Sequence, residues 1–124
     1  MTLTKIGNDT KSQKKTGLKG GEPAHIDSLI EYGEDAVVSR TLVENDAGTV
    51  TLFAFDEGQG LSEHTAPFDA LVQIVDGESE IIIGGASNRV KNGELILMPA
   101  NIPHALRATK RFKMILTMLR KRPA

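Results

Sequence analysis

Short apolar runs separated by turn residues recur along most of the chain. Residues 37–43 are rich in β-branched side chains and end at the turn sequence Asn45-Asp46-Ala47-Gly48. Residues 49–55 (TVTLFAF) alternate between polar and apolar types and stop at Asp56-Glu57-Gly58. Such runs bounded by Gly, Asn and Asp are typical of β-strands joined by tight turns. Further strands are expected over residues 70–76, 79–83, 89–91, 94–98, 104–108 and 112–119.

The spacing of these runs predicts an all-β fold. About eight or nine short strands at regular intervals are typical of a β-sandwich or barrel. Residues 70–76 and 79–83 flank Gly77-Glu78, which predicts a hairpin at this glycine. Residues 112–119 carry a large apolar side chain at every second position, which favours a strand over a helix. Only residues 26–32 are expected to form a short helical turn, with Leu29 and Ile30 as its apolar contacts.

Length and composition indicate one domain behind a polar leader. A chain of 124 residues fits a single domain. Residues 1–24 are rich in Lys, Thr and Gly, and we expect a flexible leader there and one folded domain over residues 25–124. Cysteine is absent, which excludes disulfides, thiolate catalysis and zinc–thiolate sites. The apolar runs are far shorter than the roughly 20 residues of a membrane helix, so we expect a cytoplasmic protein.

The charge distribution bears on possible partners. The net charge is −1, but the C-terminal quarter of the chain is basic. Aromatic residues do not interleave with these basic residues, so neither nucleic acid nor a membrane is an expected partner. We expect a homodimer instead, because residues 37–43 and 112–119 would expose strand edges in a monomer. A two-fold axis would cover those edges and bring the basic tail against acidic neighbours.

Two histidines are the main candidates for chemistry. His64 lies in a segment that begins at Gly58, and His104 directly follows Pro103, which fixes its approach. Two histidines from distant strands suggest a shared cavity, with a metal site as one reading of it. His25 lies beside the leader and is expected to be exposed. Ser62 and Ser79 lack a convincing base and acid partner, so a hydrolase is not supported.

At these histidines the chain resembles the small single-domain cupins, which are RmlC-like jelly rolls of the conserved-barrel type. The first cupin motif is matched by Gly58, His64 and Gly77, and the second by Gly93, Pro99 and His104. The resemblance covers about residues 36–120. It implies a double-stranded β-helix, or jelly-roll barrel. It implies little about activity, because this fold carries many unrelated functions.

The departures from the motifs concern the metal. Typical metal-binding cupins hold a divalent ion with two histidines and a glutamate of the first motif and one histidine of the second. Here the second histidine position is Ala66 and the glutamate position is Ala70. The resemblance therefore implies that only His64 and His104 remain as ligands for a possible Zn, Ni, Mn or Fe ion.

Asp69 is the carboxylate nearest to the missing glutamate position. If it faced the cavity, it would complete a two-histidine, one-carboxylate set like that of non-haem iron oxygenases. Neighbouring residues of a strand point to opposite faces, however. The alternative is that Asp69 caps a turn after Pro67.

Three functions are compatible with these residues. The first is a cupin that binds a small molecule of unassigned identity in a pocket lined by His64, His104, Ala66, Ala70, Phe53 and Met98. The second is a metal-dependent oxygenase or isomerase with a reduced ligand set. The third is a non-catalytic dimeric interaction module. No motif names a substrate.

Overall fold

The computed structural model describes residues 17–120 and confirms the prediction of an all-β chain. One helical turn precedes eight strands in the described part of the chain. Their bounds are α1 Ile26–Leu29, β2 Val37–Asn45, β3 Gly48–Phe55, β4 Gly60–His64, β5 Asp69–Ile83, β6 Ala86–Lys91, β7 Leu95–Met98, β8 His104–Arg107 and β9 Phe112–Leu119. No helix among residues 17–120 is long and apolar enough to cross a membrane.

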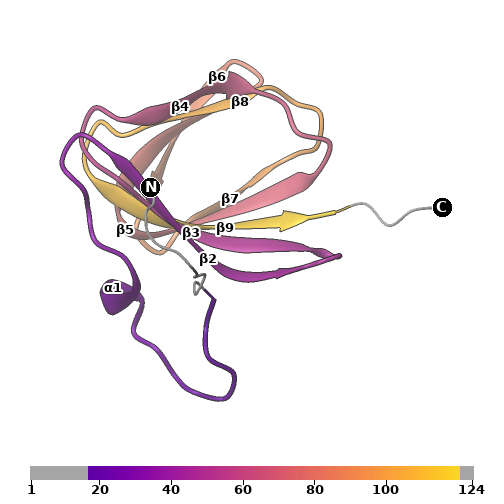
Figure 1. The fold of residues 1–124 in the computed structure, drawn as a ribbon. Helices are drawn as coiled ribbons and strands as arrows, with labels where there is room; N and C mark the ends of the chain where they lie inside the picture. Colours follow the sequence, from indigo (N-terminus) through magenta and orange to yellow (C-terminus); the bar gives the residue numbers. More distant parts are fainter. Residues whose placement is uncertain (1–16, 121–124) are drawn as a thin grey trace.

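Two antiparallel sheets face each other and form a curled jelly-roll barrel (Figure 1). The lower sheet in this view has the order β2-β3-β9-β5-β7. The upper sheet has the order β6-β5-β8-β4. The long strand β5 belongs to both sheets: its first half pairs with β7 and β9, and its second half pairs with β6 and β8.

The hairpin predicted at Gly77 is wrong. The chain runs through this glycine as one strand, β5, and reverses only after Ile83. The β5–β9 register shifts between Ile74 and Asp76, and Gly77 has a φ of 72°. A Cβ at Gly77 would lie 2.1 Å from the carbonyl oxygen of Arg111. Glycine is thus required where β5 bends from one sheet into the other. In the sequence, a glycine that allows such a bend cannot be told from a glycine in a turn, which explains the wrong prediction.

The main core lies between the two sheets. Phe55 and Phe112 face each other on β3 and β9, and their rings stack with centroids 4.5 Å apart. Both are fully buried, as are Val72, Ile74 and Ile81 of β5. The inward positions alternate with outward ones along each strand, which is how a barrel of this size is filled.

A second, smaller cluster lies on the outer face of the lower sheet. Leu29 and Ile30 pack there against Leu52 and Ala54, so the segment around α1 covers part of this face. The helix itself ends at Leu29 and is shorter than the expected residues 26–32. The Arg40 guanidinium donates to the Leu29 carbonyl, and the Tyr32 hydroxyl donates to Asp76.

The two ends of the chain are described in part. Residues 1–16 of the expected leader, and residues 121–124 of the basic tail, lie outside the described range. The Gly17 and Leu18 amides donate to the carbonyls of Thr41 and Leu42, so the chain enters along the free side of β2. The expectation that residues 112–119 form an edge is wrong, because β9 lies between β3 and β5. The edges of the lower sheet are β2 and β7.

Candidate functional site

The two candidate histidines lie side by side on neighbouring strands. His64 ends β4 and His104 begins β8, and the two are register partners. The register shifts between Leu61 and His64, and this irregularity aligns the two side chains. Strand β4 had no counterpart among the expected strands, because residues 60–64 are mostly polar and carry a glycine. The sequence therefore suggested two histidines in one cavity without indicating that they are in contact.

The imidazole rings meet through their Nε2 atoms. These atoms lie 3.2 Å apart, and the rings are tilted by 72° with centroids 4.4 Å apart. The Nδ1 atom of His64 lies 2.7 Å from the Ser62 carbonyl oxygen, and that of His104 lies 3.1 Å from the Ile102 carbonyl oxygen. A carbonyl oxygen only accepts, so both Nδ1 atoms carry hydrogen and donate. Both rings are thereby held with their Nε2 lone pairs turned toward each other.

The two rings differ in exposure. His64 is exposed, whereas His104 is only 4% exposed. Two nitrogens with lone pairs do not hydrogen-bond unless one of them carries a proton.

The loop before His104 is held by backbone hydrogen bonds. The Asn101 amide donates to the Ala66 carbonyl at 2.8 Å, and the Gly84 amide donates to the Pro103 carbonyl at 2.8 Å. Asn101 has a φ of 67°, a left-handed conformation that asparagine tolerates better than most residues. The loop therefore presents His104 from a fixed backbone, as the prolines in the sequence suggested.

Asp69 does not join the histidines. Its Oδ1 atom accepts the Ala100 amide at 2.9 Å, and the residue is exposed while its neighbour Ala70 is buried. The aspartate thus points to the opposite side of β5 from Ala70 and ties the start of β5 to the Pro99–Pro103 loop. Among residues 17–120 no group of three His, Cys, Asp or Glu side chains is placed to hold a metal ion.

Two of the four apolar residues predicted to line the pocket, Ala70 and Met98, are buried in the main core. Ala70 and Met98 are register partners on β5 and β7, and each is 2% exposed. Phe53 is half-buried against the same core, and Ala66 is half-buried in the segment that leads to β5. Alanine at positions 66 and 70 places no charge on this side of the barrel.

A cavity that the sequence did not indicate runs along β4 and β8 and has a volume of about 690 Å³. Neither histidine lines it. Its lining residues are Glu57, Gly58, Gln59, Gly60, Leu61, Ser62, Leu106, Arg107, Ala108 and Thr109. Ser62, at one end of this groove, is also the residue whose carbonyl holds His64. Gly58 was recognised only as a motif residue, although its missing side chain leaves open space here.

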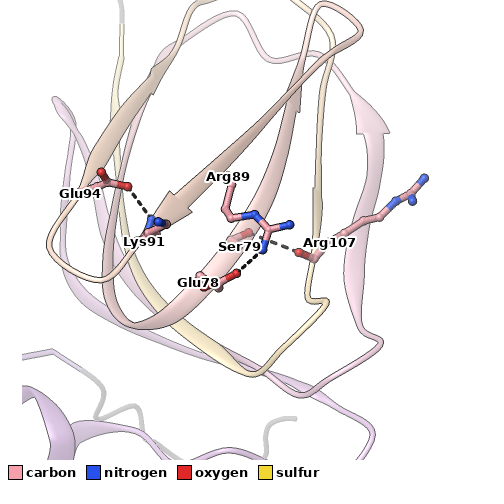
Figure 2. A network of polar contacts seen from close by, with 6 residues as sticks. All are labelled: Glu78, Ser79, Arg89, Lys91, Glu94 and Arg107. Atoms are coloured by element: carbon pink, nitrogen blue, oxygen red, sulfur yellow. Dashed lines mark hydrogen bonds and ion pairs between the residues drawn. The ribbon is translucent and has the colours of Figure 1, made fainter.

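Two further polar clusters lie away from the histidines. On the outer side of the upper sheet, Arg89 donates to Glu78 at 2.6 Å and the Lys91 amide donates to Glu94 at 2.8 Å (Figure 2). Figure 2 also shows the Arg107 side chain extending away from the Glu78–Arg89 pair. Exposed ion pairs of this kind contribute little to stability.

The other cluster holds the N-terminal segment on the lower sheet. Arg111 donates to Asp56 at 2.7 Å and lies over the Tyr32 ring, 4.9 Å from its centroid. The hydrogen bond from Arg111, together with the Asp35 amide, lowers the pKa of the Asp56 carboxyl. Burial, together with the hydrogen bond to Asp76, raises the pKa of the Tyr32 hydroxyl. These contacts are structural, since they fasten residues 32–36 to β5 and β9.

Comparison with known proteins identifies the family. The cupin domain profile matches residues 51–119, which is more than half of the chain. A conserved protein of unknown function from Streptococcus pyogenes is 32% identical, with 92% of this chain and 100% of that chain covered and a TM-score of 0.82. A cupin superfamily protein from Desulfitobacterium hafniense is 31% identical, with 84% and 95% covered and a TM-score of 0.78.

A cupin 2 conserved barrel domain protein from Leptotrichia buccalis is 41% identical over 75% of this chain and 45% of that chain, with a TM-score of 0.73. No curated protein sequence matches the chain. The profile match, the two facing sheets and the paired motif histidines agree with one another. The chain belongs to the cupin family.

Proposed function

We propose that this cupin binds a small molecule at the His64–His104 pair and that it does so without a resident metal ion. The observation that carries the proposal is the 3.2 Å contact between two Nε2 atoms whose rings are both anchored through Nδ1. Anchored imidazoles are pre-oriented, so a ligand does not have to order them on binding. The Nε2 atoms point toward each other, so they are the ring atoms left to hydrogen-bond a ligand that lies between or beside the two rings.

The Nε2 contact indicates the ligand chemistry. We infer that the two nitrogens share one proton, which gives the pair a positive charge. No ion pair of either histidine with a carboxylate occurs in the described part of the chain. Ala66 and Ala70 stand where a metal-binding cupin has a histidine and a carboxylate. A ligand that brings its own carboxylate or enolate oxygen would supply the missing negative charge and accept the proton.

The neighbouring groove supplies the space. Its volume of about 690 Å³ lies within the usual range for small-molecule sites, roughly 300–1,000 Å³. Leu61, Leu106 and Ala108 give it an apolar side, and Ser62, Arg107 and Thr109 give it polar groups. A ligand lying along β4 could therefore contact His64 with its anionic end.

A resident catalytic metal does not fit the residues present. Catalytic metal sites in proteins usually have three protein ligands, and this chain offers two imidazoles here. Asp69, the candidate for a third, is bonded to the Ala100 amide on the other side of β5. The oxygenase and isomerase functions considered from the sequence are for this reason not the ones we propose.

The test is a ligand screen that compares the wild type with histidine-to-alanine variants. Untagged full-length protein would be screened by thermal shift against small carboxylic acids and enolisable ketones, and hits measured by calorimetry. We expect His64→Ala to abolish binding, because His64 is the exposed member of the pair. The control is His25→Ala, which removes the chain's only other histidine, at an exposed position before α1, and should bind like the wild type.

Metal analysis of the same preparation separates the alternatives. Near-stoichiometric metal that is lost in His64→Ala would overturn the metal-free proposal in favour of the metal-dependent enzyme. A screen in which no hit depends on His64 would leave the interaction module as the better description.

A further inference from the structure

Arg107 differs from the other arginines of residues 17–120 in that its guanidinium has no partner there. The described part of the chain holds five arginines. Four of them donate to carboxylates or to backbone carbonyls, namely Arg40, Arg89, Arg111 and Arg120. The Arg107 side chain is exposed and extends away from the nearby Glu78–Arg89 pair (Figure 2). It forms no ion pair with any carboxylate of residues 17–120.

This free guanidinium lies at the groove along β4 and β8. Arg107 is the register partner of Gly60 on β4. It is the only basic residue that lines the groove, and Glu57 is the only acidic one. The two do not pair with each other. The groove therefore contains a positive charge that its own walls leave without a counterion.

The groove reaches both faces of the upper sheet because β4 is an edge strand. Within residues 17–120, β4 pairs only with β8. Leu106 is 2% exposed and points into the core, so the next residue, the exposed Arg107, points outward; both line the groove. His104 is buried on the same side as Leu106, and His64 is its register partner. A ligand along the free edge of β4 thus has His64 on its inner side and Arg107 on its outer side.

The length of β4 sets the spacing between these two contacts. His64 and Gly60 are the two ends of β4, four residues apart, which corresponds to about 13 Å at roughly 3.3 Å per residue. Gly60 has no side chain to cover this stretch, and a Cβ there would lie 2.3 Å from the Leu106 carbonyl oxygen. The only side chain of β4 that lines the groove between Leu61 and His64 is that of Ser62.

We propose that the ligand is a dicarboxylate whose second carboxylate is bound by Arg107, and that Arg107 thereby determines specificity. This inference rests on the proposed function, since the first acidic group of the same ligand contacts the His64–His104 pair. A guanidinium donates two parallel hydrogen bonds to a carboxylate, which fixes orientation as well as charge. The apolar middle of such a ligand lies against Leu61 and Leu106.

Glu57 favours a carboxylate over a phosphate at this end of the groove. Its side chain is exposed and lines the same groove as Arg107. A phosphate monoester carries close to two negative charges at neutral pH, and a carboxylate carries one. Repulsion from Glu57 grows with the charge of the ligand, and no lysine lines the groove to offset it. A single negative charge therefore matches the single guanidinium.

The test is calorimetry of the full chain with straight-chain α,ω-dicarboxylic acids of increasing length, each compared with the monocarboxylic acid of the same length. We expect the diacid that spans about 13 Å to bind about tenfold more tightly than its monoacid. Arg107→Gln should remove this gain and leave monoacid binding unchanged, and Arg107→Lys should keep only part of it. The matched control is Arg89→Gln, an exposed arginine of the same sheet outside the groove, which should behave like the wild type.

Failure of this inference is distinguishable from failure of the proposed function. Monoacids that bind through His64, with no gain for any diacid or with a gain that survives in Arg107→Gln, would overturn the role of Arg107 and leave the histidine site in place. Diacid binding that depends on Arg107 but not on His64 would overturn the bridging ligand. An ω-phosphorylated acid that binds more tightly than the diacid would replace the carboxylate with a phosphate. If no acid binds at all, the proposed function fails, and this inference fails with it.

Discussion

The contact between His64 and His104 can be measured as a coupling free energy. The perturbation is a double-mutant cycle in which each histidine is changed to alanine, alone and together. Neutral hydrogen bonds contribute about 0.5–1.5 kcal/mol net, and bonds to a charged group about 1.5–3 kcal/mol. The shared proton that we propose would make this contact charge-assisted, and the exposure of His64 reduces its contribution to stability. We therefore expect a coupling of about 1–2 kcal/mol.

The single variants should differ, because only one ring is buried. His104→Ala removes a side chain that is 4% exposed and leaves the Ile102 carbonyl without its donor, so the free energy of unfolding should fall by about 2–4 kcal/mol. His64→Ala removes an exposed ring, and water can reach the carbonyl that this ring contacts. The free energy of unfolding should therefore fall by only about 1 kcal/mol. For a domain of this size about 1 kcal/mol corresponds to roughly 4–8 °C in Tm.

The assay is urea unfolding followed by far-ultraviolet circular dichroism, since the chain has no Trp and a single Tyr. The control is a second cycle that combines His25→Ala with His104→Ala, which should be additive within about 0.5 kcal/mol. A His64–His104 coupling no larger than this control value would refute the contact, and with it the proton count from which the ligand chemistry was inferred.

Three other predictions concern the fold and its charged cluster. Gly77→Ala should destabilise the protein by more than about 2 kcal/mol, because its Cβ would meet the Arg111 carbonyl. Gly85→Ala, which has a positive φ of 84° but open space, should cost only about 1–2 kcal/mol by thermal melts. Asp56 has a lowered pKa, so its carboxylate stabilises the fold above the ordinary value of 3.8, and this contribution is lost as pH falls. The unfolding free energy of Asp56→Asn should accordingly fall less steeply on acidification than that of the wild type; an equal slope would contradict this. Tyr32 is the only tyrosine, and its pKa should lie above the ordinary value of 10.0 in an absorbance titration at alkaline pH. The free energy of unfolding should fall as pH rises past 10.0. A pKa of 10.0 for Tyr32 would contradict its burial.

Much of the fold could be predicted from the sequence, because most strands are specified locally. Residues 49–55 and 112–119 alternate clearly, and β3 and β9 begin within one residue of the expected positions. The errors occurred where one residue type serves two purposes. Gly77 allows a strand to bend in β5, but glycine after an apolar run equally indicates a turn. Strand β4 is polar and short, and it is identified only by its pairing with β8.

The two histidines could be singled out from the sequence, but their contact could not. Motif spacing singled out His64 and His104, and strand alternation correctly gave the outward direction of Asp69 as one of two alternatives. The Nε2 contact depends on the register shift between Leu61 and His64, which no local pattern encodes. Local patterns specify strands, whereas sites and surfaces depend on how distant strands are aligned.

Restoring the two missing ligands tests whether the alanines account for the metal-free site that we propose. Ala66 is half-buried near the loop and should accept histidine with little cost, whereas Ala70 is 2% exposed between Met98 and Met118. A carboxylate there would be buried without a partner, so Ala66→His with Ala70→Glu should lose more than about 3 kcal/mol without metal.

A divalent ion would restore the lost stability only if the side chains at positions 64, 66, 70 and 104 of the double variant converge on one point. At a metal concentration of about 100 times Kd, binding adds about 2.7 kcal/mol, which is roughly 10–20 °C in Tm. We expect Ni²⁺ or Zn²⁺ to produce such a shift in the double variant and not in the wild type, as measured by thermal melts with and without chelator. If the double variant is destabilised and metal does not restore it, positions 66 and 70 do not face the histidine pair. The alanines would then not be vacated ligand positions. The metal-free site that we propose would have to follow from the paired imidazoles alone, since each ring contacts a carbonyl through Nδ1 and its neighbour through Nε2.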